Sequence, residues 1–327
     1  MRNSSLLIIG TLPETSGIGG VTIHVQRLLK CLMKEDIPGV KLCDYKKVNI
    51  LTQVREIINA GVVHIHVSNP YLKLFYVIIG KLFNTRTIIT VHGRYGIYGN
   101  IRNYVHKLSL KYCDVPVLIN KESYDAVKVI NPKSVLMSAF IRPFEEDENL
   151  PIEIVEIIGR LKETGKPIFL TNASNRGFLQ DGREIYGIDF LVSYFSKHKD
   201  YILIVLDPSK QYRDCYTNLI PDNIVVYSAT VSFSALLQLT DVVVRNTATD
   251  GDSFSVKEAL YYHSPVLASD VVSRPDGVFL FKYNDEISFD QTIKTLMSSE
   301  WNVSLKEPDA IECYMKLYED LGVIVCK

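Results

Sequence analysis

Near the start of the chain, residues 6–33 read LLIIGTLPETSGIGGVTIHVQRLLKCLM. Residues 6–9 form an apolar run, residues 10–20 a glycine-rich loop, and residues 21–33 place apolar side chains with helical spacing. A run that is apolar at every position is typical of a strand covered by helices on both faces. The order of strand, glycine loop and helix predicts the first half of a βαβ unit in a parallel sheet.

The same alternation continues along the chain. Apolar runs predict further strands at residues 62–67, 87–91 and 115–119, with helices after Pro70 and around residues 102–112. An acidic run, Glu145-Glu146-Asp147-Glu148-Asn149, then interrupts the pattern and is the best candidate for a linker. A second series of strands follows at residues 168–170, 201–206, 224–226, 242–244 and 266–268. Its helices are expected at residues 188–198, 232–239, 253–262 and 286–297.

This organisation predicts two tandem doubly wound, Rossmann-like α/β domains, at residues 1–148 and 149–305. A last helical pattern spans residues 308–321, and we expect the segment 306–327 to cross back to the N-terminal domain. In doubly wound sheets, ligands bind beyond the carboxyl ends of the strands. The loops at those ends are therefore where functional residues should lie.

Composition excludes several classes of protein. Of the 327 residues, 47% are hydrophobic and 22% charged, which argues against a disordered chain, a collagen or a coiled coil. The net charge of −1 gives no general attraction to nucleic acid, so we expect no nucleic-acid partner. Residues 1–144 nevertheless carry 19 Lys and Arg against 8 Asp and Glu, a net charge of +11. This basic half suits phosphates or peripheral contact with an anionic membrane, although such charge can also serve solubility alone.

Six scattered cysteines without a C-x-x-C pattern suggest reduced thiols in a cytoplasmic protein. We expect no signal peptide, because the first apolar run is only a few residues long. We expect no membrane span either, because Lys73, Gly80 and Lys81 interrupt the most apolar stretch. The chain is therefore predicted to be soluble and cytoplasmic, with contact at the inner face of the membrane as a further possibility.

Two loops of the first half could carry chemistry. Gly17, Gly19 and Gly20 precede a helix whose N-terminal N–H groups could receive a phosphate. Their spacing departs from G-x-G-x-x-G, since Thr22 stands at the third position, and no well-formed second strand ends in an acidic residue. A dinucleotide site and an NAD-dependent oxidoreductase are therefore disfavoured, and a turn without a ligand stays open.

The second loop follows the strand at residues 87–91. His92, followed by Gly93, could present its ring to a substrate at a strand end, although a lone histidine is more often structural. His64 and His66 fall inside a predicted strand, so we interpret them as packed or hydrogen-bonded, with a smaller chance that His66 reaches a ligand.

The most informative segment, residues 245–260, reads RNTATDGDSFSVKEAL. A strand ends before it and a helix begins near Ser253, so the backbone N–H groups of Ser253, Phe254 and Ser255 could bind a diphosphate. Asp250 could accept hydrogen bonds from hydroxyls, and Glu258 could bind a ribose. Helix capping explains part of this pattern but not the polar residues that precede the cap.

The spacing of Asp250 and Glu258-Ala259, followed by Ser264-Pro265-Val266, resembles the E-x₇-E region of the retaining GT-B glycosyltransferases of family 4. Gly19-Gly20-Val21 with His24, the His92-Gly93 pair and the Tyr314-to-Tyr318 helix are similar to that family in the same order. The resemblance implies GT-B architecture, in which two Rossmann-like domains face a cleft. It also implies transfer of a sugar from a UDP- or GDP-sugar with retention of configuration and with no metal or other cofactor.

Carried over by position, the resemblance implies that Glu258 holds the donor ribose and that Asp250 binds sugar hydroxyls near the reacting carbon. The backbone at Ser253, Phe254 and Ser255 would meet the diphosphate, and Gly19 and Gly20 would line the cleft from the other domain. His92 would contact the donor sugar or polarise the reacting centre.

Two features depart from the family pattern. Tyr186 stands before Gly187, where the family places a lysine that clamps the phosphates. Arg176 or Arg183 could supply the missing charge, because arginine can bind phosphate from a shifted position. The chain is also short, so loops that grip the acceptor should be trimmed.

The acceptor implied by this reading is a glycan or a polyprenyl-diphosphate-linked sugar, as in polysaccharide or cell-surface glycan synthesis. Tyr95, Tyr98, Arg102, Tyr104, Lys107 and Lys111 form an aromatic and basic mixture that suits a membrane surface, although a solvated helix explains it equally well. Three alternatives stay open: a sugar-nucleotide-binding subunit without activity, a GT-B-like sugar-nucleotide 2-epimerase, and a metal-dependent transferase that uses Asp250-Gly251-Asp252.

Overall fold

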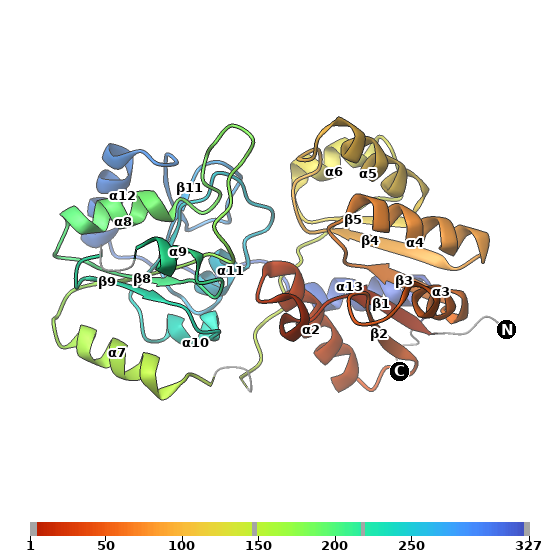
Figure 1. Cartoon of the computed structure of the whole chain (residues 1–327), viewed down its shortest axis with the longest axis horizontal. Helices are drawn as coiled ribbons and strands as arrows, with labels where there is room; N and C mark the ends of the chain where they lie inside the picture. Colours follow the sequence, from red (N-terminus) through yellow and green to blue (C-terminus); the bar gives the residue numbers. More distant parts are fainter. Residues whose placement is uncertain (1–4, 146–148, 217–219, 324–327) are drawn as a thin grey trace. The chain divides into compact units, whose positions relative to one another are not determined.

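A computed structural model describes residues 5–145, 149–216 and 220–323 of the chain. The chain divides into two compact domains: the N-terminal domain comprises residues 1–142 and 307–327, and the C-terminal domain residues 143–306. Each contains one six-stranded, entirely parallel sheet with helices on both faces (Figure 1). The predicted fold class, two doubly wound α/β domains, is confirmed.

The N-terminal sheet has the strand order β2-β1-β3-β4-β5-β6. Its elements along the chain are β1 (Leu6–Gly10), α1 (Pro13–Ser16), α2 (Gly20–Lys34), β2 (Val40–Asp44), α3 (Ile50–Asn59), β3 (Val62–Ile65), α4 (Pro70–Leu82), β4 (Arg86–Val91), α5 (Asn100–Tyr112), β5 (Val115–Leu118), α6 (Lys121–Lys128), β6 (Val135–Leu136) and, at the end of the chain, α13 (Ala310–Asp320).

The C-terminal sheet has the strand order β12-β11-β10-β7-β8-β9. Its domain contains α7 (Ile152–Lys162), β7 (Ile168–Asn172), α8 (Ile188–Lys197), β8 (Ile202–Leu206), α9 (Gln211–Cys215), β9 (Ile224–Tyr227), α10 (Phe233–Leu237), β10 (Val242–Arg245), α11 (Phe254–Tyr261), β11 (Val266–Ser269), β12 (Phe279–Phe281) and α12 (Glu286–Ser298).

Each sheet separates two apolar layers. In the N-terminal domain, α2 and α13 cover one face, and α3, α4, α5 and α6 cover the other. In the C-terminal domain, α8, α9 and α12 cover one face, and α7, α10 and α11 cover the other. Every residue of β1 and β8 is buried, as their uniformly apolar sequences require.

Several helices begin where the sequence supplies a side-chain cap. The Asn69 side chain accepts a hydrogen bond from the Tyr71 N–H, and Pro70 takes the first helical position of α4. Asp309 accepts from the Ile311 N–H at the start of α13. These caps satisfy N–H groups that have no partner within the helix.

The last helix belongs to the N-terminal domain. The side chains of Tyr314 and Tyr318 are fully buried in the core cluster that also contains α2, and the Ala310 N–H donates to the Phe140 carbonyl. The domain boundary lies at Arg142 and Pro143, before the acidic run that we expected to form the linker. Residues 146–148 of that run lie outside the described residues.

Sequence analysis missed β2 because it is a partly exposed edge strand in which Lys41 interrupts the apolar run. A second strand that ends in an acidic residue is therefore present, contrary to expectation. Asp44 closes it and accepts a hydrogen bond from the Thr15 hydroxyl at 2.6 Å. Among the described residues, no helix combines the length and the apolar character needed to cross a membrane.

Gly187, the residue that precedes α8, is predicted to tolerate no side chain. Its φ of +56° is in the left-handed region, and a Cβ there would lie 2.3 Å from Asn246 Nδ2. Gly187→Ala should therefore lower the free energy of unfolding by more than about 1 kcal/mol, measured by urea denaturation. Gly159→Ala is the control, because Gly159 is exposed within α7 and a Cβ there meets open space. That change should stabilise by up to about 1 kcal/mol, and equal effects of the two changes would contradict the prediction.

Candidate functional site

Each sheet has one place where the strand order reverses. In the N-terminal sheet, β1 pairs with β2 on one side and β3 on the other. In the C-terminal sheet, β7 pairs with β8 on one side and β10 on the other. The connections that leave the two central strands diverge there, and in sheets of this kind ligands bind beyond the carboxyl ends at such a point. Both groups of polar residues described below lie at these ends.

In the C-terminal domain, a buried ion cluster surrounds Asp250. Arg245, the last residue of β10, donates from Nε to Asp250 Oδ2 at 3.2 Å, and Arg274 donates from Nη1 to the same oxygen at 2.8 Å. The three side chains are between 3% and 12% exposed. Arg245 also donates to the carbonyl and side-chain oxygens of Asn172 at the end of β7, at 3.3 Å each. The cluster therefore bridges the two strands at the reversal point.

The charges in this cluster depend on one another. Burial alone would raise the pKa of Asp250, but the charges and hydrogen bonds of Arg245 and Arg274 outweigh burial and lower the pKa to about 2. Asp250 is thus ionised throughout the neutral range. Two guanidinium groups meet one carboxylate, so this group of three carries a net positive charge.

The segment that leads into α11 is also buried. Ser253 is 8% exposed, Ser255 5% and Glu258 4%, and the hydroxyls of the two serines are 3.2 Å apart. Asp252 forms an ion pair with Lys257 one turn along the helix. Asp250, Ser253, Phe254, Ser255 and Glu258 thus belong to one short loop and the helix that follows it. A helix N-terminus beside buried cations can bind an anion.

The two arginines proposed to replace the missing lysine are both paired. Arg176 donates from Nη2 to Asp189 Oδ2 at 2.7 Å, and its guanidinium lies over the Phe178 ring. Arg183 pairs with its exposed neighbour Asp181, also at 2.7 Å. The structure therefore ties each of them to a carboxylate.

Tyr186, which stands where the lysine was expected, lies under Arg245. The guanidinium carbon is 5.1 Å from the centre of the tyrosine ring, a distance at which cation and ring attract each other. The Tyr186 hydroxyl lies 2.6 Å from Ser174 Oγ, in the loop after β7. The guanidinium of Arg245, at the end of β10, therefore places a positive charge beside Tyr186.

In the N-terminal domain, the glycine loop ends at α2. Gly19 is the N-cap residue, its N–H donates to the Thr22 hydroxyl at 3.1 Å, and Gly20 begins the helix. A Cβ at Gly19 would meet no atom within 4 Å, so the space beside this backbone is open. The hydrogen bond from Thr15 to Asp44 anchors the loop to the edge of the sheet.

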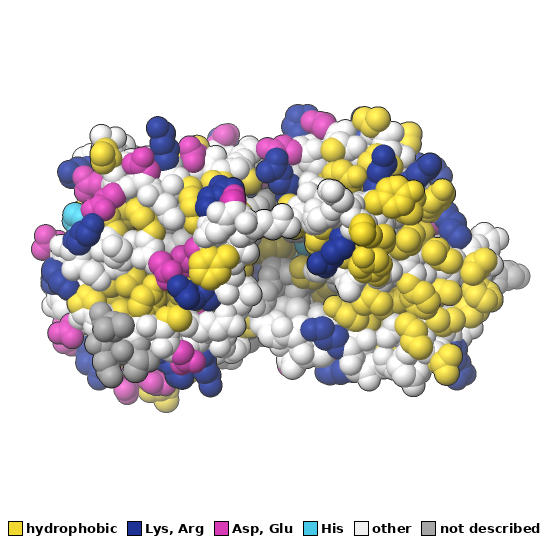
Figure 2. Space-filling model, turned by 45° about the horizontal axis from the view of Figure 1, so that its top comes forward, with side chains coloured by type: hydrophobic (Ala, Val, Ile, Leu, Met, Phe, Trp, Pro, Cys, Tyr) yellow, Lys and Arg dark blue, Asp and Glu magenta, His cyan; other side chains and the backbone are white. Residues whose placement is uncertain are grey.

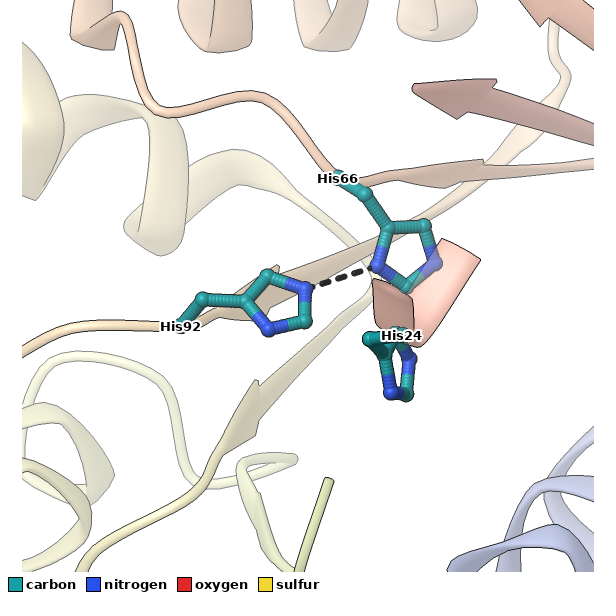
Figure 3. A group of neighbouring side chains, drawn as sticks. All are labelled: His24, His66 and His92. Carbon is teal, nitrogen blue, oxygen red and sulfur yellow. Dashed lines mark hydrogen bonds between the residues drawn. The ribbon is translucent and has the colours of Figure 1, made fainter. Parts of the chain in front are cut away.

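Beside this loop, the structure brings together three histidines from different elements (Figure 3). His24 lies on α2, His66 follows β3, and His92 follows β4. His66 Nδ1 and His92 Nε2 are 2.9 Å apart, and His24 Nδ1 is 2.8 Å from the Ala139 carbonyl oxygen. His24 and His66 are at most 1% exposed, and His92 is half-buried.

These imidazoles are neutral at physiological pH. Burial lowers the pKa of His24 to about 4 and holds the pKa values of His66 and His92 well below the usual range. The proximity of the other histidines adds to the effect at His66 and His92. Neutral rings act as hydrogen-bond donors and acceptors but carry no charge with which to bind a phosphate.

Sequence reasoning named His92, Asp250 and Glu258 but missed their partners. Arg245 could have been found, because it ends the strand that leads into the informative segment. Arg274 lies in the loop after β11, and the sequence around it has no pattern that indicates a site. His66 was placed inside a strand, whereas β3 ends at Ile65 and leaves His66 at the carboxyl end.

Comparison with known proteins supports the fold. No family model matches the chain, and no curated protein matches it in sequence. Solved structures of similar fold include Anabaena HepE in complex with UDP-glucose, with a TM-score of 0.66, 10% identity and 90% of each chain covered.

Two further structures are similar. Sucrose-phosphate synthase from Thermosynechococcus elongatus has a TM-score of 0.63 and 14% identity, with 98% of this chain and 96% of that chain covered. The S. aureus MnaA–UDP structure also has a TM-score of 0.63 and 14% identity, with 99% and 98% covered. At these identities the likeness concerns the GT-B fold.

The buried histidines should make the stability of the protein depend on pH. An unfolded histidine has a pKa near 6.5, whereas His24 has one of about 4 in the fold, so only the unfolded state takes up a proton between these values. The free energy of unfolding should therefore be highest above pH 6.5 and fall as the pH approaches 4, by about 3 kcal/mol for His24.

Urea denaturation at a series of pH values from 7.5 to about 4.5 measures this slope, which should be smaller in His24→Gln. His198→Gln, at a half-buried position of the C-terminal domain, is the matched control and should keep the wild-type slope. The same slope in all three proteins would contradict the assignment of a neutral, buried His24.

Proposed function

We propose that the protein is a glycosyltransferase that uses a nucleotide-diphosphate sugar. The observation that carries the proposal is the cluster of Arg245, Asp250 and Arg274 beside the N-terminus of α11, at the reversal point of the C-terminal sheet. Crystal structures of similar fold contain UDP or UDP-glucose, which adds support from outside the chain.

In this proposal the donor diphosphate lies against the first turn of α11. The N–H groups of Ser253, Phe254 and Ser255 and the cations Arg245 and Arg274 stabilise the negative charge that builds up on the leaving group. Arg245, resting on Tyr186, provides the charge that the family places on a lysine. Arg176 and Arg183 then act as structural ion pairs, or reach the phosphates after leaving their carboxylates.

The other named residues have matching roles. Glu258 binds the donor ribose, and Asp250 orients the two arginines and accepts hydrogen bonds from the sugar. Because protein cations neutralise the diphosphate, we expect transfer to need no metal and no other cofactor. The donor is a UDP- or GDP-sugar, and the sugar is transferred with retention to a glycan or lipid-linked acceptor.

Nucleotide binding tests the donor site directly. UDP or GDP at 100 times its dissociation constant should add about 2.7 kcal/mol of stability, visible as a rise in melting temperature that a chelator leaves unchanged. Glu258→Gln should weaken binding by roughly tenfold or more, because it removes the charged acceptor of the ribose hydroxyls. Glu286→Gln, in an exposed ion pair with Lys197, is the matched control and should bind like wild type.

If no nucleotide raises the melting temperature, or if Glu258→Gln binds as well as wild type, the donor site is wrongly assigned. Binding without any turnover of the sugar nucleotide would favour a sugar-nucleotide-binding subunit without activity. The tyrosine at position 186 motivates that alternative, and activity that appears in Tyr186→Lys would support it.

We also propose that the N-terminal domain contacts an anionic membrane, where a lipid-linked acceptor would be found. Large apolar side chains are exposed on α4, on α5 and in the loops beside them, and Figure 2 shows apolar side chains gathered on this domain. The most exposed are Ile101 (73%), Leu82 (72%) and Tyr104 (63%). Arg102 lies over the Tyr98 ring and Lys111 over the Tyr112 ring, so cations and aromatic rings alternate as a membrane interface requires.

Vesicle sedimentation tests this surface. The protein should bind vesicles that contain anionic lipid, bind neutral vesicles less, and dissociate as salt rises. Ile101→Asp should reduce binding several-fold because it places a charge where an apolar side chain enters the interface. Ile287→Asp is the matched control, since Ile287 is also 73% exposed but lies on α12 of the C-terminal domain. Equal loss in both variants, or no binding by the wild type, would contradict the proposal.

A further inference from the structure

We infer that His24, His66 and His92 form a binding site for one divalent transition-metal ion of the zinc type. The three residues come from α2, from the residue after β3 and from the residue after β4, and their rings face a common centre (Figure 3). They meet at the reversal point of the N-terminal sheet. The donor proposal depends on the C-terminal domain, so this inference stands independently of it.

The spacing of the rings fits one shared ion. The ring centres are 5.0 Å apart for His24 and His66, 4.8 Å for His24 and His92, and 5.2 Å for His66 and His92. A zinc ion lies about 2.0–2.1 Å from a ligating nitrogen, so three imidazoles on a tetrahedral ion have centres roughly 5 Å apart. One nitrogen from each ring already lies within 4.8 Å of one from each of the others. Rotation of the rings about their Cβ–Cγ bonds can close the remaining gap.

Hydrogen bonds prepare the rings as ligands. The Ala139 carbonyl can only accept, so His24 carries its proton on Nδ1 and its lone pair on Nε2. A backbone carbonyl that receives the second N–H of a ligating histidine is the usual support in metal sites.

Two nitrogens of the group have no hydrogen-bond partner among the described residues. These are His66 Nε2 and His92 Nδ1, both shielded from solvent. A buried polar atom without a partner costs about 1–3 kcal/mol, so its retention calls for an explanation such as an ion or a water. The hydrogen bond between His66 Nδ1 and His92 Nε2 has one donor and one acceptor, so one of the two outer nitrogens carries a proton and the other a lone pair. The two facing nitrogens can both bind an ion once the donating ring moves its proton to its outer nitrogen.

The neighbouring residues hold the site in place. The His64 ring centre is 4.0 Å from that of His66. Both nitrogens of His64 are occupied, by the Tyr318 hydroxyl at 2.6 Å and the Thr90 hydroxyl at 2.7 Å. His64 therefore supports His66 and is not itself offered as a ligand.

The ligand set indicates which ions bind. Three imidazoles suit Zn²⁺, Co²⁺, Ni²⁺ and Cu²⁺, whereas Mg²⁺ and Ca²⁺ prefer oxygen ligands. Three protein ligands leave a fourth tetrahedral position for water. His92 is half-buried, so an ion can enter from its side.

Titration with metal tests the inference on the full-length chain, purified without a histidine tag and stripped with a chelator. Zn²⁺ followed by calorimetry should bind with a stoichiometry of one and a micromolar or lower dissociation constant. Co²⁺ should give the strong visible absorption of a tetrahedral site, and Mg²⁺ should not compete. His66→Gln should weaken Zn²⁺ binding by more than the roughly 10–100-fold that loss of a supporting partner alone causes.

His198→Gln is the matched control, because His198 lies outside the group and should leave Zn²⁺ binding unchanged. If His66→Gln does not fold, His92→Gln replaces it, since the half-buried position after β4 tolerates change better. The inference is overturned if Zn²⁺ fails to bind with one-to-one stoichiometry. It is also overturned if Co²⁺ shows only the weak absorption of an octahedral site, or if the folded variant binds as tightly as wild type.

Discussion

In each domain the first strand of the sheet lies in its interior, paired with one strand on each side. The two candidate sites depend on this strand order. Because β1 lies between β2 and β3, and β7 between β8 and β10, the chain leaves these central strands in opposite directions. The carboxyl ends of β1 and β3 bring α2 close to His66, and those of β7 and β10 bring Asn172 into contact with Arg245. Residues far apart in sequence thus become neighbours through strand order.

The two sites differ in how they offset the free-energy cost of burying titratable side chains. Around Asp250, charges are buried together, and removal of one partner would leave an uncompensated charge in a region of low polarity. Around His66, titratable groups are buried in their neutral form, which avoids that penalty but makes the fold sensitive to acid. The first arrangement is suited to holding a diphosphate, and the second to offering lone pairs.

The fold class could be predicted because strands buried on both faces appear in the sequence as continuous apolar runs. The edge strand β2 could not, since only its last two residues are buried and its pattern is mixed. The same distinction applies to the candidate site. Asp250 and Glu258 lie in one short segment, so local spacing was enough to suggest them. Arg274 and His66 reach their partners only through the strand order, which the sequence does not reveal.

The path of the chain through the two domains has a consequence for biosynthesis. The C-terminal domain is continuous, from Pro143 to Lys306, so it can fold as soon as it leaves the ribosome. The N-terminal domain is synthesised first, yet its core includes Tyr314 and Tyr318, which emerge only after the C-terminal domain. Until then His64 lacks its hydrogen bond with the Tyr318 hydroxyl, and the apolar face that α13 covers stays exposed. The half of the protein that is made first is therefore the half that is finished last.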